Sequence, residues 1–168
     1  MAAQKKVVIR QFQGSLAWGY LPAIGFLDDG LVTLMQVDGR AKAIDFKDIK
    51  TICYVRDFNL DDPDDPERIG RRAFPARPRG DGLWLRAAFL DGDSLEGLVS
   101  FDMAFVESLL EDRGFFLTPP DARANAQRVF MPRAALASLE VLGYITAPSK
   151  RPAAKPAKDT GQPRLFAE

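Results

Sequence analysis

The chain has 168 residues, 46% of them hydrophobic and 27% charged, which is enough for one globular domain or two small ones. Basic and acidic residues balance to a formal net charge of zero, so no global field draws the whole protein onto nucleic acid or a membrane. Histidine is absent and Cys53 is the single cysteine, which excludes an internal disulfide framework and removes the residue most often used for metal binding and for acid–base work near neutral pH.

The first unit, residues 5–58, is expected to form about five short antiparallel strands. Its elements are a hairpin at Lys5–Tyr20, a connection at Pro22–Asp29, a strand at Gly30–Met35, a turn at Asp38-Gly39 with a returning strand at Ala41–Phe46, and a last strand at Asp48–Val55. So many hairpins are too many for a parallel sheet, and they favour a small bent sheet or a partly closed barrel. Cys53 lies in the apolar run of the last strand, so we expect a buried structural thiol.

A charged segment follows at residues 59–81, and its prolines rule out a long regular element. An acidic block, Asp61 to Glu67, comes immediately before an arginine-rich block that includes Arg71, Arg72, Arg77 and Arg79. The two blocks can pair with each other on the surface. Alternatively, the arginines form a phosphate-binding face with Phe74 as an anchor.

The second unit, residues 82–146, repeats the pattern of the first. Its expected elements are a hairpin at Leu83–Val99, a short helix or irregular excursion at Phe101–Leu110, a strand at Gly114–Leu117 that matches Gly30–Thr33, a loop at Thr118–Gln127, a returning strand at Arg128–Pro132, and a last strand that begins at Leu136. Gly14 and Gly19 correspond in spacing to Gly92 and Gly97, and the Ile49/Ile52 interval recurs at Leu136/Leu139. An internal duplication explains this correspondence best.

Each unit resembles the Sm-like fold, the small bent β barrel of Sm, LSm and Hfq proteins. The resemblance rests on strand order, on the spacing at Phe12–Gly19 and Leu90–Gly97, and on the closing patterns Ile44–Ile52 and Val129–Leu139. It implies a mainly β protein with two tandem Sm-like five-stranded bent-sheet barrels. The run from Thr118 to Arg133 is also similar to a family of bacterial proteins that has no assigned activity.

Residues 147–168 are rich in proline, lysine and alanine, and we expect a disordered tail. Near its end, Gln162, Leu165 and Phe166 resemble the peptide by which bacterial DNA polymerases and repair proteins dock on the β sliding clamp. Adjacent leucine and phenylalanine side chains would fill an apolar groove, and the glutamine amide would set the register. The alternatives are that these residues fold back on the body, bind another partner, or have no role.

Nothing in the sequence predicts an enzyme, a metal site, a cofactor or a small-molecule substrate. No signal peptide and no membrane-spanning apolar run are evident, so we expect a cytoplasmic protein. The leading interpretation is a non-enzymatic adaptor in replication or repair, tethered to the sliding clamp. A second is a nucleic-acid-binding module of Sm type, with contacts from Arg71, Arg72, Arg77, Arg79, Arg128 and Arg133. A third is a scaffold that binds another protein by edge-strand pairing, and its signature would be an uncovered strand edge without basic residues.

Overall fold

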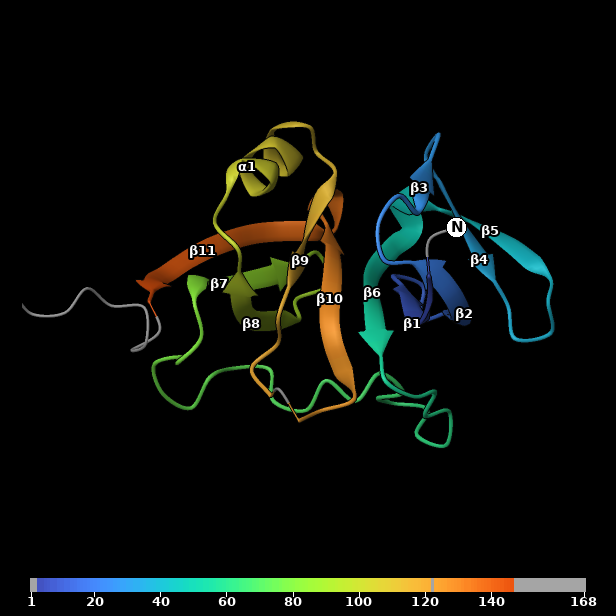
Figure 1. Ribbon diagram of the computed structural model, residues 1–168, viewed down its shortest axis with the longest axis horizontal. Coiled ribbons are helices and arrows are strands. Elements are labelled where there is room, and N and C mark those ends of the chain that lie inside the picture. Colours follow the sequence, from blue (N-terminus) through green and yellow to red (C-terminus); the bar gives the residue numbers. More distant parts are fainter. Residues whose placement is uncertain (1–2, 122, 147–168) are drawn as a thin grey trace, which may run out of the picture.

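The computed structural model describes residues 3–121 and 123–146, which form two β-rich halves joined by a long irregular segment (Figure 1). The strands are β1 (Gln4–Gln11), β2 (Leu16–Pro22), β3 (Leu27–Asp28), β4 (Leu31–Met35), β5 (Ala41–Asp45), β6 (Ile49–Val55), β7 (Gly82–Phe89), β8 (Ser94–Val99), β9 (Gly114–Leu117), β10 (Ala126–Pro132) and β11 (Leu136–Ile145). The helices are α1 (Met103–Leu110) and two one-turn 3-10 helices at Phe46–Asp48 and Arg133–Ala135. The expected mainly β architecture is confirmed, and the region Phe101–Leu110 contains a short helix.

The strands form two antiparallel sheets. An eight-stranded sheet has the order β3-β4-β2-β1-β6-β10-β9, with β5 paired to β4, and a three-stranded sheet has the order β11-β7-β8. The larger sheet therefore contains strands of both halves. It crosses from the first unit to the second where β10 pairs with β6, and these two strands run side by side at the centre of Figure 1.

The two units repeat the same pairings in the same register. β1 pairs with β2 and β6, as β7 pairs with β8 and β11, and β4 pairs with β5 as β9 pairs with β10. Even an irregularity near the start of the last strand recurs, because the register shifts both at the Ile49 end of β6 and at the Leu136 end of β11. Equivalent positions can therefore be assigned residue by residue, which supports the internal duplication.

Gly19 and Gly97 occupy equivalent positions for a steric reason. A Cβ atom on Gly19 would overlap the carbonyl oxygen of Met35, and one on Gly97 would overlap Leu117 and the carbonyl of Thr118. The end of β4 thus crosses directly over Gly19, and the end of β9 crosses over Gly97. Only glycine permits such a close approach of two backbones.

The expectation of two separate barrels is not met, because the described part of the chain contains no closed barrel and the sheet is shared between the units. β2 meets β4 only at the pair Tyr20–Met35, and β8 meets β9 only at the bridge Leu98–Thr118. The strands diverge beyond these crossings, which leaves each unit an open, strongly bent sheet. The junction between units is a long-range pairing of β6 with β10, and no local sequence pattern encodes it.

One equivalence drawn from the sequence is wrong by a single residue. Gly114 was matched to Gly30, but the ladders place Gly114 opposite Pro132 and Leu31 opposite Asp45, each pair lying just before the 3-10 turn. Gly114 is therefore equivalent to Leu31. The shift matters, because in a strand a one-residue slip moves every side chain to the opposite face.

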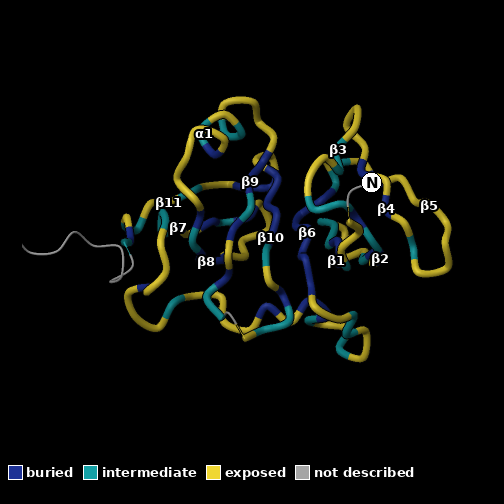
Figure 2. The backbone as a smooth tube through the Cα atoms, in the orientation of Figure 1, coloured by how far each residue is buried: buried dark blue, intermediate teal, exposed yellow. Residues whose placement is uncertain are grey.

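The described structure has one hydrophobic core in each unit, and each core also includes side chains from the other unit. Phe130 of β10 packs in the first core with Ile52 and Tyr54, whereas Val8 and Cys53 of the first unit pack in the second core. Figure 2 shows the consequence, with β6 coloured as buried along its length. The two units are thus joined by one continuous hydrophobic contact rather than by a flexible hinge.

Candidate functional site

Two of the strands that pair on one side only, β11 and β5, are the equivalents of the two strands at the junction. β6 is buried at every residue, because β1 and β10 flank it. Its counterpart β11 pairs with β7 alone, and most of its residues are partly or fully exposed. Likewise β5, the counterpart of β10, pairs only with β4 and buries only Ile44. No other described strand covers the outer edges of β11 and β5, and such edges are sites where another chain can add hydrogen bonds.

The β11 edge contains neither lysine nor arginine along its ten residues, Leu136–Ile145. Val141 is 61% exposed and Tyr144 is 62% exposed. The ring of Phe101, also exposed, lies edge-on to Tyr144 at 6.4 Å between centroids. Proteins usually protect an edge strand with charged residues or proline, whereas β11 has one charged residue, Glu140, beside exposed apolar side chains.

The segment 59–81 is fastened to the outer face of the small sheet by one buried carboxylate. Glu96 of β8 is 6% exposed and accepts hydrogen bonds from the Trp84 indole (3.0 Å), the Phe74 backbone N–H (3.2 Å) and the Arg86 guanidinium (3.2 Å). The backbone N–H of Glu96 also donates to the carbonyl of Arg72 at 2.8 Å. Hydrogen bonding to Glu96 raises the pKa of Arg86. The segment therefore lies against the sheet in a defined place, with Phe74 packed edge-on to Trp84.

A second buried carboxylate fastens the same segment to the first unit. Glu67, 2% exposed, receives a two-pronged contact from Arg10, with Nε at 2.7 Å and the second nitrogen at 2.9 Å. This contact, opposed by burial, raises the pKa of Arg10. Glu67 thus pairs with a residue of β1 rather than with an arginine of its own segment, which differs from the surface pairing of the two blocks considered above.

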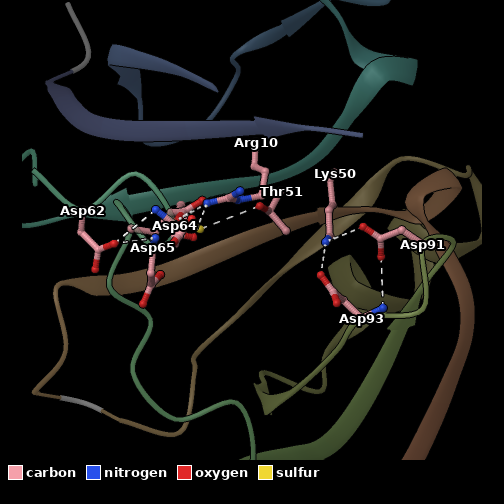
Figure 3. Close-up of polar contacts among 10 residues, drawn as sticks. Arg10, Lys50, Thr51, Asp62, Asp64, Asp65, Asp91 and Asp93 are labelled. Carbon is pink, nitrogen blue, oxygen red and sulfur yellow. Dashed lines mark hydrogen bonds and ion pairs between the residues drawn. The ribbon is translucent and has the colours of Figure 1, made fainter. Parts of the chain in front are cut away.

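A buried lysine joins the two units directly (Figure 3). Lys50 of β6 is 6% exposed, and its ammonium donates to Asp91 at 2.6 Å and to Asp93 at 2.5 Å. Both carboxylates lie in the turn between β7 and β8, where Asp93 N–H also donates to Asp91 at 3.1 Å. The ammonium lies 5.1 Å from the centre of the Phe89 ring. Burial raises the pKa of Asp91, but its hydrogen bonds from Lys50 and from backbone N–H groups outweigh that effect, and the net pKa is lowered.

The six arginines considered for nucleic-acid contact are spread along different elements. Arg72 donates to the Ser94 carbonyl and Arg77 to the Tyr144 carbonyl, so these two bind opposite strands of the small sheet. Arg71 and Arg79 are exposed in the same segment. Arg133 is exposed on the second 3-10 turn.

Arg128 lies at the junction of the units. Its guanidinium is 3.8 Å from the centre of the Phe116 ring and 5.3 Å from that of Tyr54, and it donates to the Ala23 carbonyl at 3.3 Å. Burial raises the pKa of Tyr54 to about 12, although Arg128 lowers it. The arginine faces two rings that are themselves packed in the first core, so its contacts stabilise the junction.

A cavity of about 540 Å³ lies between α1 and the strands β8 and β9. Two of its polar side chains already have local partners. Asp102 caps α1 by accepting from Phe105 N–H at 2.9 Å, and Ser108 donates to the Phe105 carbonyl at 2.7 Å. We find no set of convergent polar groups there that would define a substrate site.

Cys53 is fully buried in the second core, and burial raises the pKa of its thiol. Within residues 3–121 and 123–146, no three His, Cys, Asp or Glu side chains come together in a way that could hold a metal ion. In the same residues, no helix has the length and apolarity needed to cross a membrane. The proposed clamp-binding residues Gln162, Leu165 and Phe166 lie outside the described part of the chain.

Sequence reasoning missed the buried charges Lys50, Glu67 and Glu96. A signal was present for two of them, because Lys50 lies beside an unbroken apolar run at Ile49–Val55 and Glu96 interrupts the apolar positions of β8. A charged residue in such a run is usually paired when it is buried. Its partner, however, is distant in the sequence and could not be named.

Comparison with known proteins identifies the family of the chain but assigns it no activity. No curated protein and no solved structure matches the chain. Residues 3–143, which include both units and the segment between them, match a family of unknown function, DUF6982. This agrees with the expected membership in a family without assigned activity, and the chain belongs to that family.

Proposed function

We propose that this protein is a non-enzymatic adaptor that joins other protein chains. Its body would hold a protein partner at an open strand edge, and its C-terminal residues would dock on the bacterial β sliding clamp, in DNA replication or repair. Each half of this proposal depends on a different feature of the chain.

The main support for the body's role is the uncovered β11 edge. Its outer side has no strand partner, Val141 and Tyr144 are exposed, and its own ten residues include no basic residue, although Arg77 of the segment 59–81 donates to the Tyr144 carbonyl. These properties suit an extended protein segment, which gains backbone hydrogen bonds and apolar contact, and they do not suit a phosphate backbone. The Lys50 ion pairs join the two units and the Glu67 pair fastens the segment 59–81 to the first unit, so the edge is presented by a rigid support.

The support for the tail's role is the sequence Gln162-Pro163-Arg164-Leu165-Phe166. Leucine and phenylalanine in an otherwise polar, proline-rich segment are suited to an apolar groove of a partner. The residues between Ile145 and Gln162 would allow the body to remain clear of a ring-shaped clamp.

The test is binding of the full chain to a purified bacterial β clamp. We expect micromolar binding that the double change Leu165→Ala/Phe166→Ala abolishes. A matched control, Lys158→Ala/Asp159→Ala, changes the same tail outside the peptide and should leave the affinity unchanged. If the intact chain does not bind, or if the double change has no effect, the clamp proposal is wrong.

The alternative is a nucleic-acid-binding module of Sm type, for which the arginine-rich segment is the favouring observation. In that case the chain would bind single-stranded oligonucleotides with an affinity that falls steeply with salt. Arg71→Ala/Arg79→Ala would weaken this binding, and the tail change would not. Clamp binding without oligonucleotide binding would exclude this alternative.

A further inference from the structure

The junction between the two units is a head-to-tail contact between different strands. β10, the fourth strand of the second unit, pairs antiparallel with β6, the last strand of the first unit. Its ladder joins Phe130 to Ile52, Val129 to Cys53 and Arg128 to Tyr54. The contact uses the outer edge of the last strand of the first unit and the outer edge of the fourth strand of the second unit. The corresponding edge of the other unit is left without a strand partner in each case.

The two unused edges are the equivalents of those already paired. β5 corresponds to β10, since each precedes a 3-10 turn, and β11 corresponds to β6, since each follows one. The burial of the four strands follows their pairing. β6 and most of β10 are buried, whereas β11 and β5 are largely exposed. The structure therefore contains, at its two ends, the two halves of the contact it makes internally.

We propose that the β5 edge of one copy of this chain pairs antiparallel with the β11 edge of a second copy. This inference rests on the proposed use of the β11 edge as a protein-binding surface, and it names the partner. Carrying over the internal ladder by equivalent positions places Ala43 opposite Leu139, Lys42 opposite Glu140, and Ala41 opposite Val141.

The side chains at these positions are complementary. Lys42 and Glu140 are both exposed, and they carry the only charges at the three facing positions. Glu140 also accepts a hydrogen bond from Arg86 of β7 at 2.9 Å, so Lys42 would add a second cation to a carboxylate that is already held in place. Ala41 and Ala43 are exposed as well, and their small side chains leave space for the larger Leu139 and Val141. Opposite charges directly across a ladder stabilise it, and an uncharged strand would lose this pair.

A head-to-tail contact repeats from copy to copy, so it produces either a closed ring or an open chain of copies. Each copy would add one C-terminal tail. An assembly would therefore present several docking peptides together, which raises the effective affinity for a partner with several grooves.

The test is the mass of the full chain in solution, measured by sedimentation or light scattering over a wide concentration range. Glu140→Lys and Lys42→Glu should each weaken the association at least about fivefold, because each places like charges opposite one another. The combined Lys42→Glu/Glu140→Lys variant should restore it. Glu107→Lys, an exposed charge reversal on α1, should have no effect.

A chain that remains monomeric at several hundred micromolar, on the order of the weakest specific contacts, overturns the inference. So does an association that neither single charge reversal weakens, or that the combined variant fails to restore. Loss of folding is checked by circular dichroism, and the restored double variant guards against it. Because the clamp is absent from this assay, its failure leaves the clamp proposal standing, and a clamp-binding failure leaves self-association standing.

Discussion

The Lys50 contact offers the sharpest test of how the units are joined. The perturbation is Asp91→Asn/Asp93→Asn, which removes both negative charges around a lysine whose side chain is 7% exposed. Asparagine keeps a side-chain oxygen, so the turn bond from residue 93 N–H and the shape of the turn are retained. What changes is the charge that compensates the buried ammonium.

Removing one partner of a fully buried ion pair usually costs about 3–5 kcal/mol. The cost here should be smaller, because the Asp91 and Asp93 side chains are 37% and 57% exposed and water reaches that side of the pair. An asparagine oxygen also still accepts a hydrogen bond from the ammonium. We therefore expect a loss of about 2 kcal/mol in the free energy of unfolding, or a Tm about 4–8 °C lower.

The assay is thermal and urea unfolding, repeated in a Lys50→Met background. Lys50→Met alone should cost at most about 2 kcal/mol, because the two carboxylates that it leaves without a partner are 37% and 57% exposed and water can solvate them. In that background the double asparagine change should cost little, because no ammonium remains to be compensated. Equal costs in both backgrounds would refute the reasoning, and so would a double change that costs nothing in the native sequence.

Three further predictions concern the glycines at the strand crossings, the Cys53 thiol and the Asp91 carboxylate. Gly19→Ala and Gly97→Ala should each destabilise the fold by at least about 3 kcal/mol in thermal unfolding, whereas Gly39→Ala, where the added Cβ meets no atom but φ is +87°, should cost about 1 kcal/mol. Equal effects at all three glycines would contradict the crossing argument. Cys53 should not react with a thiol reagent until the protein is unfolded in urea, because it is fully buried and burial raises its pKa. Reaction of the native protein at the rate of a free thiol would be incompatible with this burial. The folded pKa of Asp91 is lowered, so its contribution to stability is present above the unfolded pKa of about 3.9 and is lost as pH falls through the folded value. The Tm of the native sequence should therefore decline below about pH 4, and the Tm of Lys50→Met should decline less steeply. A decline of equal slope in both proteins would contradict this role of Asp91.

The local elements could be predicted because short-range features encode them. Asp38-Gly39 and Asp91-Gly92 are hairpin turns whose backbone geometry favours those residues, and the apolar runs beside them give the strands. The equivalence of Gly19 and Gly97 was also visible in the spacing, and the structure supplies its steric reason.

The junction could not be predicted, because its determinants are distant in the sequence. Ile52 and Phe130 face each other across β6 and β10, yet each residue alone fits an ordinary strand. A prediction that does not include this pairing closes each barrel on its own strands and leaves Phe130 out of the first core, where the structure places it. The open edges of β5 and β11 were equally hidden, since exposure depends on which strand lies alongside rather than on the strand's own residues.

The buried charges show the same limit at the level of single side chains. Lys50 and Glu96 contradict the apolar pattern around them, and their burial is possible only because aspartates, an indole and an arginine reach them from other elements. Such groups are placed by tertiary packing, which the linear pattern does not specify.

The adaptor proposal is tested most directly by asking what Phe166 contacts. A full chain with Phe166→p-benzoylphenylalanine is irradiated with purified β clamp, and the cross-linked products are separated by mass. The account predicts a cross-link between the chain and the clamp that excess unlabelled chain competes away. Cross-links found only within the chain's own body would show that the tail folds back, and they would contradict clamp docking.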